Sequence, residues 1–310
     1  MLREEQIQSV QNMAAGIRRR TLGLALSRGE GYIAQAFSSA ELFGVLFQCV
    51  LQFNALEKPL VPHAFRSVPH AGFNETGMDY YGAAAPDKDR FFLSATQYSV
   101  VLYCALVETG RMAESGLEMF NINGSVVEMI GASHSPGMEV MSGSLGQTLS
   151  QAVGVAIARK RRGDTGRVVV FMGDGELQSG QTWEAVQCMN HYHLDNMLLV
   201  VDVNSCQVDG ATKDIMELPT PAKRFEAFGM NTHEVDAHDI EAVFKACEDK
   251  KSGQPTVVLA YSDVCRGMEL MRERAPKFHF IRFTDDMEKQ RYQAFYDQMP
   301  AAQNKAEDHA

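Results

Sequence analysis

Asp174 and Asn204 are the two residues of this chain whose types and spacing best suit a chemical site. Asp174 lies in a Gly-Asp-Gly-Glu segment, 173–176, and Asn204 follows it further along the chain. A carboxylate and an amide oxygen are ligands that Mg²⁺ takes from proteins, and water and phosphate oxygens complete its shell. Gly173 and Gly175 let the backbone approach a phosphate closely. The pattern favours a magnesium-bound diphosphate, with an ordinary Asp-Gly turn as the alternative.

The flanking elements predict that these two residues meet. Apolar, β-branched runs at 167–172 and 196–203 indicate two strands, and the stretch 178–192 between them is typical of a helix. A strand–helix–strand unit has a right-handed crossover, which places both strand ends at one edge of a parallel sheet. We therefore expect Asp174 and Asn204 to converge there, with the backbone carbonyl of Cys206 as a third ligand of the cation.

The rest of the pattern predicts one α/β domain over residues 1–300 and a disordered tail over 301–310. Arg18, Arg19 and Arg20 lie in the middle of the first helix, and we expect them on a solvated or interface face. The segment 61–88 is rich in Pro, Gly and His and indicates a long surface loop. Helices are expected at 5–28, 38–52, 99–110, 147–162, around 223–227, from 239 and after 285, and further strands at 233–235 and 255–261.

Composition limits the classes of partner. The chain has 310 residues, of which 45% are hydrophobic, and its net charge of -10 makes nucleic acid an unfavourable partner. The six cysteines form no C-x-x-C pair. The beginning of the chain shows no signal-peptide pattern, and no apolar run is expected to span a membrane. These features predict a cytoplasmic protein with neither nucleic acid nor membrane as partner.

Longer segments resemble a known family. The run 173–210 resembles the thiamine-diphosphate-binding region of transketolases, and the segment 142–147, Ser-Gly-Ser-Leu-Gly-Gln, is similar to that family's T-G-S-L-G-Q. Further similarities span nearly the whole chain and are closest to short, separately encoded N-terminal transketolase subunits. They lie at 89–94, 136–139, 227–229 and 236–239.

The resemblance implies a parallel-sheet thiamine-diphosphate-binding α/β fold with helices on both faces. It implies thiamine diphosphate as cofactor, together with Mg²⁺ or, in its place, Ca²⁺ or Mn²⁺. Asp174, Asn204 and Cys206 are then the expected metal ligands. The residues expected to bind the cofactor are Gly143, Leu145, Gly173, Asp174, Gly175, Glu176, Asn204, Val208 and His279.

The chain also departs from the family pattern around the expected donor. Tyr32 and Gln97 stand where transketolases carry histidines, whereas His279 matches a family histidine. These three are the expected catalytic residues. Gln97 can form hydrogen bonds but cannot transfer protons near neutral pH, and Tyr32 is bulkier than His. The donor can therefore be either a ketose or a 2-oxo acid. A site that lacks residues to pair with hydroxyl groups selects less strongly for donors that carry them. His134 is a further candidate for lining the site.

The resemblance implies a function that needs a second chain. In transketolases, the glutamate that activates the cofactor lies on a pyrimidine-binding domain, and this sequence ends about where that domain would begin. We expect an α₂β₂ assembly in which the partner carries the pyrimidine-binding and C-terminal domains. The reaction would transfer a two-carbon ketol or acyl unit from a donor to an aldehyde or other acceptor. The alternatives are a 2-oxo-acid decarboxylating carboligase, a dehydrogenase E1 α chain, and a catalytically silent cofactor-binding subunit.

Overall fold

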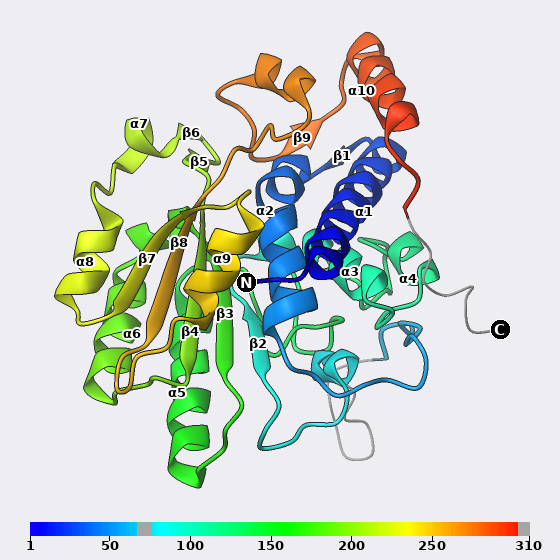
Figure 1. Ribbon diagram of the computed structural model, residues 1–310. Coiled ribbons are helices and arrows are strands. Elements are labelled where there is room, and N and C mark those ends of the chain that lie inside the picture. The colour runs from blue at the N-terminus through cyan, green and yellow to red at the C-terminus, as the bar shows by residue number, and fades with distance from the viewer. Residues whose placement is uncertain (67–75, 303–310) are drawn as a thin grey trace.

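A five-stranded parallel sheet lies at the centre of the computed structural model, which describes residues 1–66 and 76–302. The strand order is β2-β3-β4-β8-β7 (Figure 1). β3 and β4 are buried along their whole lengths, which is why their sequences are continuously apolar. The register places Gly173 opposite Asp202, so the ends of β3 and β4 lie side by side. The strands are β2 (Arg90–Leu93), β3 (Val168–Gly173), β4 (Met197–Val203), β7 (Asn231–Asp236) and β8 (Thr256–Tyr261).

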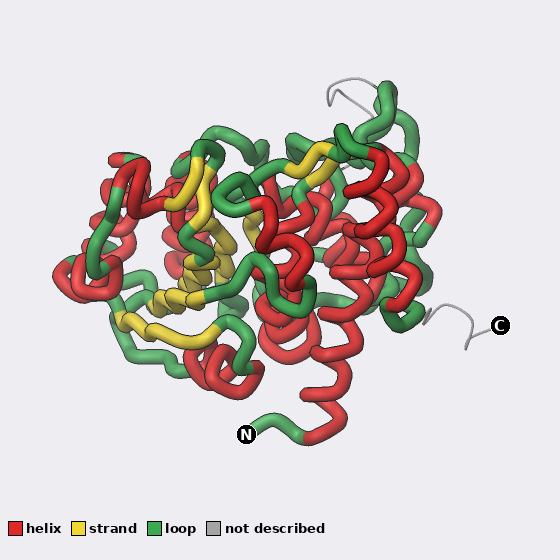
Figure 2. The backbone as a smooth tube through the Cα atoms, turned by 90° about the horizontal axis from the view of Figure 1, so that it is seen from above, coloured by secondary structure: helices red, strands yellow, loops and turns green. Residues whose placement is uncertain are grey.

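Helices cover both faces of this sheet, as the view from above shows (Figure 2). Phe171 and Val200 point to one face and Val170 and Leu199 to the other, as the alternation of a strand requires. The first face packs against α1 (Glu4–Arg28), α2 (Ile33–Val45), α3 (Ser99–Glu108) and α9 (Ile240–Glu248). The second packs against α5 (Gln147–Arg162), α6 (Gly180–His191) and α8 (Pro221–Ala227). The predicted fold class is confirmed.

Two small antiparallel ribbons lie outside the central sheet. β1 (Glu30–Gly31) pairs with β9 (Ile281–Arg282), which brings the start of α2 next to the segment around His279. β5 (Cys206–Gln207) pairs with β6 (Gly210–Ala211) directly after Asn204. The remaining helices are α4 (Ser115–Glu118), α7 (Thr212–Met216) and α10 (Asp286–Gln298). Of the predicted tail, 303–310 lies outside the described residues.

Short 3₁₀ segments complete the fold. They cover Gly77–Tyr81, Thr96–Tyr98, Asp174–Gln178 and Glu269–Arg274. The segment 61–88 is not entirely a surface loop, because Tyr80 and Tyr81 are buried in the core. Residues 67–75 of this segment lie outside the described part of the chain.

The helix predicted over 38–52 begins five residues earlier than expected. α2 starts at Ile33 and continues as a π-helical segment, Leu46–Val50. Ser38 and Ser39, at the predicted start, are of a residue type that is common at N-caps, but both are buried inside the helix, and Ser39 Oγ donates to the carbonyl of Gln35. The window Ile33–Val50 is long and apolar enough to span a membrane, contrary to expectation, although 78% of it is buried inside the protein. Its apolar character is that of a core helix.

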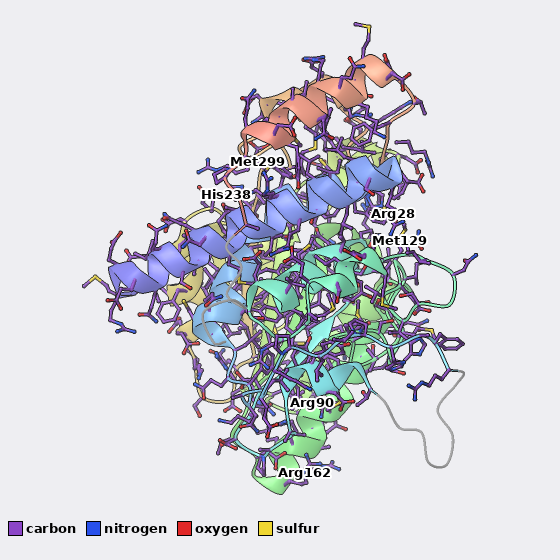
Figure 3. All side chains as sticks on the ribbon, turned by 90° about the vertical axis from the view of Figure 1, so that its right-hand side faces the viewer. Arg28, Arg90, Met129, Arg162, His238 and Met299 are labelled. Atoms are coloured by element: carbon purple, nitrogen blue, oxygen red, sulfur yellow. The ribbon has the colours of Figure 1, made fainter. Side chains whose placement is uncertain are left out.

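The arginines of α1 do not form a solvated face. Arg20 is 9% exposed, and its Nε donates to Glu108 Oε1 at 2.7 Å. Arg19 donates to the carbonyl of Met299 at 2.8 Å, which holds the end of α10 beside α1 (Figure 3). The solvated alternative is therefore wrong, because the partners of Arg19 and Arg20 lie on elements far away in the sequence, whereas the interface alternative stays a prediction.

Glu41 on α2 joins two elements through a buried charge cluster. Arg18 Nη1 donates to Glu41 Oε1 at 2.7 Å, and His238 Nδ1 lies 3.1 Å from Glu41 Oε2. His238 Nε2 accepts the N–H of Asp263, so its Nδ1 carries the proton that Glu41 accepts. Burial alone would raise the pKa of Glu41, but His238 and the Arg18 guanidinium outweigh it and lower the pKa to about 2.

This cluster predicts a pH dependence of stability. Because the folded-state pKa is lowered, the stabilisation is complete above the unfolded pKa, near 4.5, and is lost as pH falls towards 2. A shift of this size corresponds to about 3 kcal/mol. Denaturant titrations between pH 7 and pH 2.5 measure the free energy of unfolding of wild type and Glu41→Gln. The variant should be less stable than wild type at pH 7 by about 2–3 kcal/mol, and its free energy of unfolding should change less with pH in the acid range. Parallel slopes for both proteins would contradict this.

Candidate functional site

A cavity of about 140 Å³ opens at the carboxyl ends of β2, β3 and β4. This is the edge at which parallel α/β sheets bind ligands, because loops and helix starts gather there. The cavity unites segments that are distant in the sequence. Its lining residues are Gln35, Ala95, Gln97, Tyr98, Leu145, Gly173, Asp174, Gly175, Glu176, Gln178, Asn204, Cys206, Gln207, Val208 and His279.

Asp174 holds a carboxylate in this cavity without a side-chain partner of opposite charge. Its Oδ2 accepts the N–H of Ser205 at 2.9 Å. Burial and the nearby charge of Asp202 raise the pKa of Asp174 to about 7, despite the backbone N–H groups that favour the anion. A buried carboxylate with so little compensation fits a cation at this position, because a divalent ion would stabilise the charged form.

Asn204 has a fixed orientation. Its Nδ2 donates to Tyr98 Oη at 2.9 Å and to Asp202 Oδ2 at 3.1 Å, and both partners are buried. Its Oδ1 accepts the N–H of Cys206 at 2.9 Å and retains a second lone pair. Ser205 between them adopts a φ of 57°, a turn conformation that aims its N–H at Asp174. The predicted convergence of Asp174 and Asn204 is therefore present.

Asp202 and Tyr98 were missed by the sequence analysis. Asp202 is fully buried and accepts from Ser38 Oγ and Tyr98 Oη, both at 2.7 Å. It also accepts from Ser262 Oγ. The alternation of β4 could have indicated Asp202, because a lone acidic residue inside an apolar strand needs buried partners. No sequence signal identified Tyr98.

The expected metal ligands, Asp174, Asn204 and Cys206, include one carboxylate. Among the described residues, no group of three or more His, Cys, Asp and Glu side chains has a metal-binding arrangement. Asp174, Asn204 and the carbonyl of Cys206 therefore fit a hard cation only where phosphate oxygens complete its shell. Burial raises the pKa of the Cys206 thiol to about 12, so the thiol stays protonated and the carbonyl is the better ligand. The chemistry of this donor set fits a cation held jointly with a diphosphate.

Glu176 connects the cavity to the loop before α5. It is 1% exposed, and its Oε2 accepts from Ser94 Oγ at 2.6 Å and from the N–H of Gly146 at 2.9 Å. Leu145 lines the cavity, whereas Gly143 does not line it and lies behind with a φ of 101°. Only glycine adopts that conformation readily, so the role of Gly143 that the structure shows is to shape the loop.

His279 reaches the cavity from the segment before β9. Burial lowers the pKa of its imidazole, so the ring is neutral at neutral pH. Tyr32 does not line the cavity; its ring packs edge-on against His279, with ring centroids 5.5 Å apart. Gln97 and Val208 line the cavity as expected. His134 lies elsewhere and faces Glu128, with Nε2 and Oε2 3.3 Å apart.

Residues 59–272 match a family model described as transketolase, thiamine diphosphate binding domain. The chain belongs to the transketolase family. It is 32% identical over 278 residues to the transketolase family protein y4mO of Sinorhizobium fredii, covering 88% of this chain and 90% of that protein. It is 35% identical over 205 residues to one subunit of the apulose-4-phosphate transketolase of Actinobacillus succinogenes, covering 66% of this chain and 74% of that relative.

Solved transketolases share the fold. The Campylobacter jejuni transketolase superposes with a TM-score of 0.72 at 23% identity, covering 94% of this chain and 46% of that one. For a Pichia stipitis transketolase mutant the TM-score is 0.74 at 23% identity, with 93% and 40% covered. This chain therefore spans less than half the length of these transketolases. The likeness to these structures shows that the fold is shared.

Proposed function

We propose that this chain is the diphosphate-binding subunit of a two-chain, thiamine-diphosphate-dependent transketolase. The observation that carries the proposal is the convergence of Asp174 and Asn204 at the carboxyl edge of the sheet. Asp174, Asn204 and the carbonyl of Cys206 would hold Mg²⁺ and, through it, the diphosphate. Two relatives support a separate second chain, because each is named as one subunit of a larger enzyme. One belongs to an apulose-4-phosphate transketolase, and the other is the 6-deoxy-6-sulfo-D-fructose transketolase subunit SqwG.

The side chains of the cavity then have defined tasks. When bound, thiamine diphosphate would supply the carbon nucleophile that this class of C–C bond cleavage needs. Leu145 and Val208 are apolar side chains of the cavity wall, and once a partner covers them they would exclude water from the reacting atoms. Neutral His279 can accept a proton from a donor hydroxyl or return one, whereas Gln97 can only hold a substrate by hydrogen bonds.

Exposed apolar side chains around the cavity support a covering partner. Leu145 and Val208 are 43% and 67% exposed although they line the cavity. Ile130 lies close to Gly143, and the carbonyl of Met216 accepts from Gln178, which lines the cavity. We call the following six exposed residues the apolar rim: Ile130, Met141, Leu145, Val208, Ile215 and Met216.

The size of the cavity supports the same conclusion. At about 140 Å³ it is smaller than the roughly 300–1,000 Å³ of typical ligand clefts. A pyrimidine-binding subunit seated on the apolar rim would supply the missing walls and bury the exposed side chains. The test is ketol transfer by this chain with and without its second subunit. We expect activity only in the mixture, and its loss when the metal is chelated.

A further inference from the structure

Gln35 is a cavity residue that the sequence analysis did not identify. It lies in the first turns of α2, is 5% exposed and lines the cavity. Its Nε2 donates to the backbone carbonyl of His279 at 3.1 Å. A carbonyl can only accept, so this bond fixes which way the amide faces. Among the described residues, Oε1 of this cavity-lining side chain is buried without a hydrogen-bond partner.

A buried acceptor without a partner has a chemical requirement. Leaving such a group unsatisfied is unfavourable, and a ligand that donates a hydrogen bond would remove this cost. A hydroxyl group can donate, whereas a ketone oxygen or a carboxylate oxygen cannot. The position of Gln35 therefore favours a ligand that carries a hydroxyl group at this wall of the cavity.

The neighbouring residues point to the same class of ligand. Gln97 also has a buried Oε1 without a partner, and His279 is neutral because burial lowers its pKa. The described lining residues include two carboxylates, Asp174 and Glu176, but no lysine or arginine. A carboxylate of the substrate would therefore find acceptors and like charges on this chain, which is unfavourable.

We propose that Gln35 determines donor specificity by accepting a hydrogen bond from a hydroxyl group of the donor. The donor is then a hydroxyketone of the ketose class, and a 2-oxo acid without such a hydroxyl is a poor substrate. This inference rests on the proposed function, because it assigns the donor of that same site. It gives a site with Tyr32 and Gln97 in place of two family histidines a residue that can select for a hydroxyl group.

The experiment compares hydroxypyruvate with pyruvate in the reconstituted two-chain enzyme. These donors differ by one hydroxyl group and share the carboxylate, so the ratio of their kcat/KM values isolates the hydroxyl. Wild type should prefer hydroxypyruvate at least tenfold. Gln35→Met keeps the length of the side chain but has no comparable acceptor, and it should lower the ratio about 10- to 100-fold. The thiamine diphosphate Kd, measured by calorimetry, should change less than about threefold.

Gln48→Met is the matched control. Gln48 lies further along the same helical segment, and its amide is paired with Ser9 and Met13 away from the cavity. The ratio of its kcat/KM values for hydroxypyruvate and pyruvate should equal that of wild type. A wild type without preference, or an unchanged ratio in Gln35→Met, would overturn the proposal whether or not ketol transfer occurs. Loss of cofactor binding in Gln35→Met would reassign Gln35 to the cofactor. Inactivity of wild type with both donors would instead contradict the proposed function itself.

Discussion

Asp174→Asn should abolish the stabilisation of this chain by Mg²⁺ and thiamine diphosphate while leaving the fold intact. At ligand concentrations of about 100 times Kd, wild type should gain about 2.7 kcal/mol, a Tm rise of about 4 °C. The amide has lost the charge that binds the cation, so the affinity should fall about 100-fold or more. Calorimetric scans with and without cofactor and metal measure the effect.

The same exchange should not destabilise the cofactor-free chain. Burial and Asp202 raise the pKa of Asp174 to about 7, so the charged carboxylate destabilises the folded chain when no cation is present. Asp214→Asn, an identical exchange at an exposed position of α7, is the control and should retain the cofactor-dependent Tm rise. A full Tm rise in Asp174→Asn would show that the cation is held elsewhere.

Met141→Asp should prevent assembly with the second subunit. Met141 belongs to the apolar rim and is 69% exposed, but it does not line the cavity. A charge placed there would be buried without a partner in the complex, so the affinity between the two chains should fall about 100-fold or more. Sedimentation of the mixed chains measures assembly, and cofactor binding by the single chain should be unaffected.

Met287→Asp provides the comparison for this prediction. Met287 is 74% exposed in the first turn of α10, outside the apolar rim, and an acidic residue is favourable near a helix N-terminus. This variant should assemble like wild type. Equal assembly by Met141→Asp and Met287→Asp would mean that the partner does not cover the apolar rim.

Local sequence signals were sufficient for much of the framework. The helix predicted at 147–162 has these bounds in the structure, because Gly146 and Gly163 flank it with φ of 82° and 76°. Strands β3, β4 and β8 differ from the predicted ranges by about one residue, since buried parallel strands are continuously apolar and β-branched. α2 was placed wrongly because it is buried on nearly all sides, so no amphipathic pattern marks its beginning.

The site was predictable where one supersecondary unit builds it. Asp174 and Asn204 converge because a right-handed crossover joins their strands. Gln35 and Tyr98 were not predictable as partners of this site, because their contacts join segments far apart in sequence, such as Tyr98 with Asp202. Such contacts depend on how α2 and the segment after β2 pack over the sheet. The roles predicted for Tyr32, Gln97 and His279 remain predictions.

The most direct measurement of the central claim is ketol transfer by separately purified chains. This chain, the second chain and their mixture would each be supplied with Mg²⁺, thiamine diphosphate, a ketose phosphate donor and an aldehyde acceptor. The account predicts product from the mixture only, with none after chelation of the metal or with Asp174→Asn. Turnover by this chain alone would contradict it. So would a mixture that assembles and binds thiamine diphosphate but transfers no two-carbon unit.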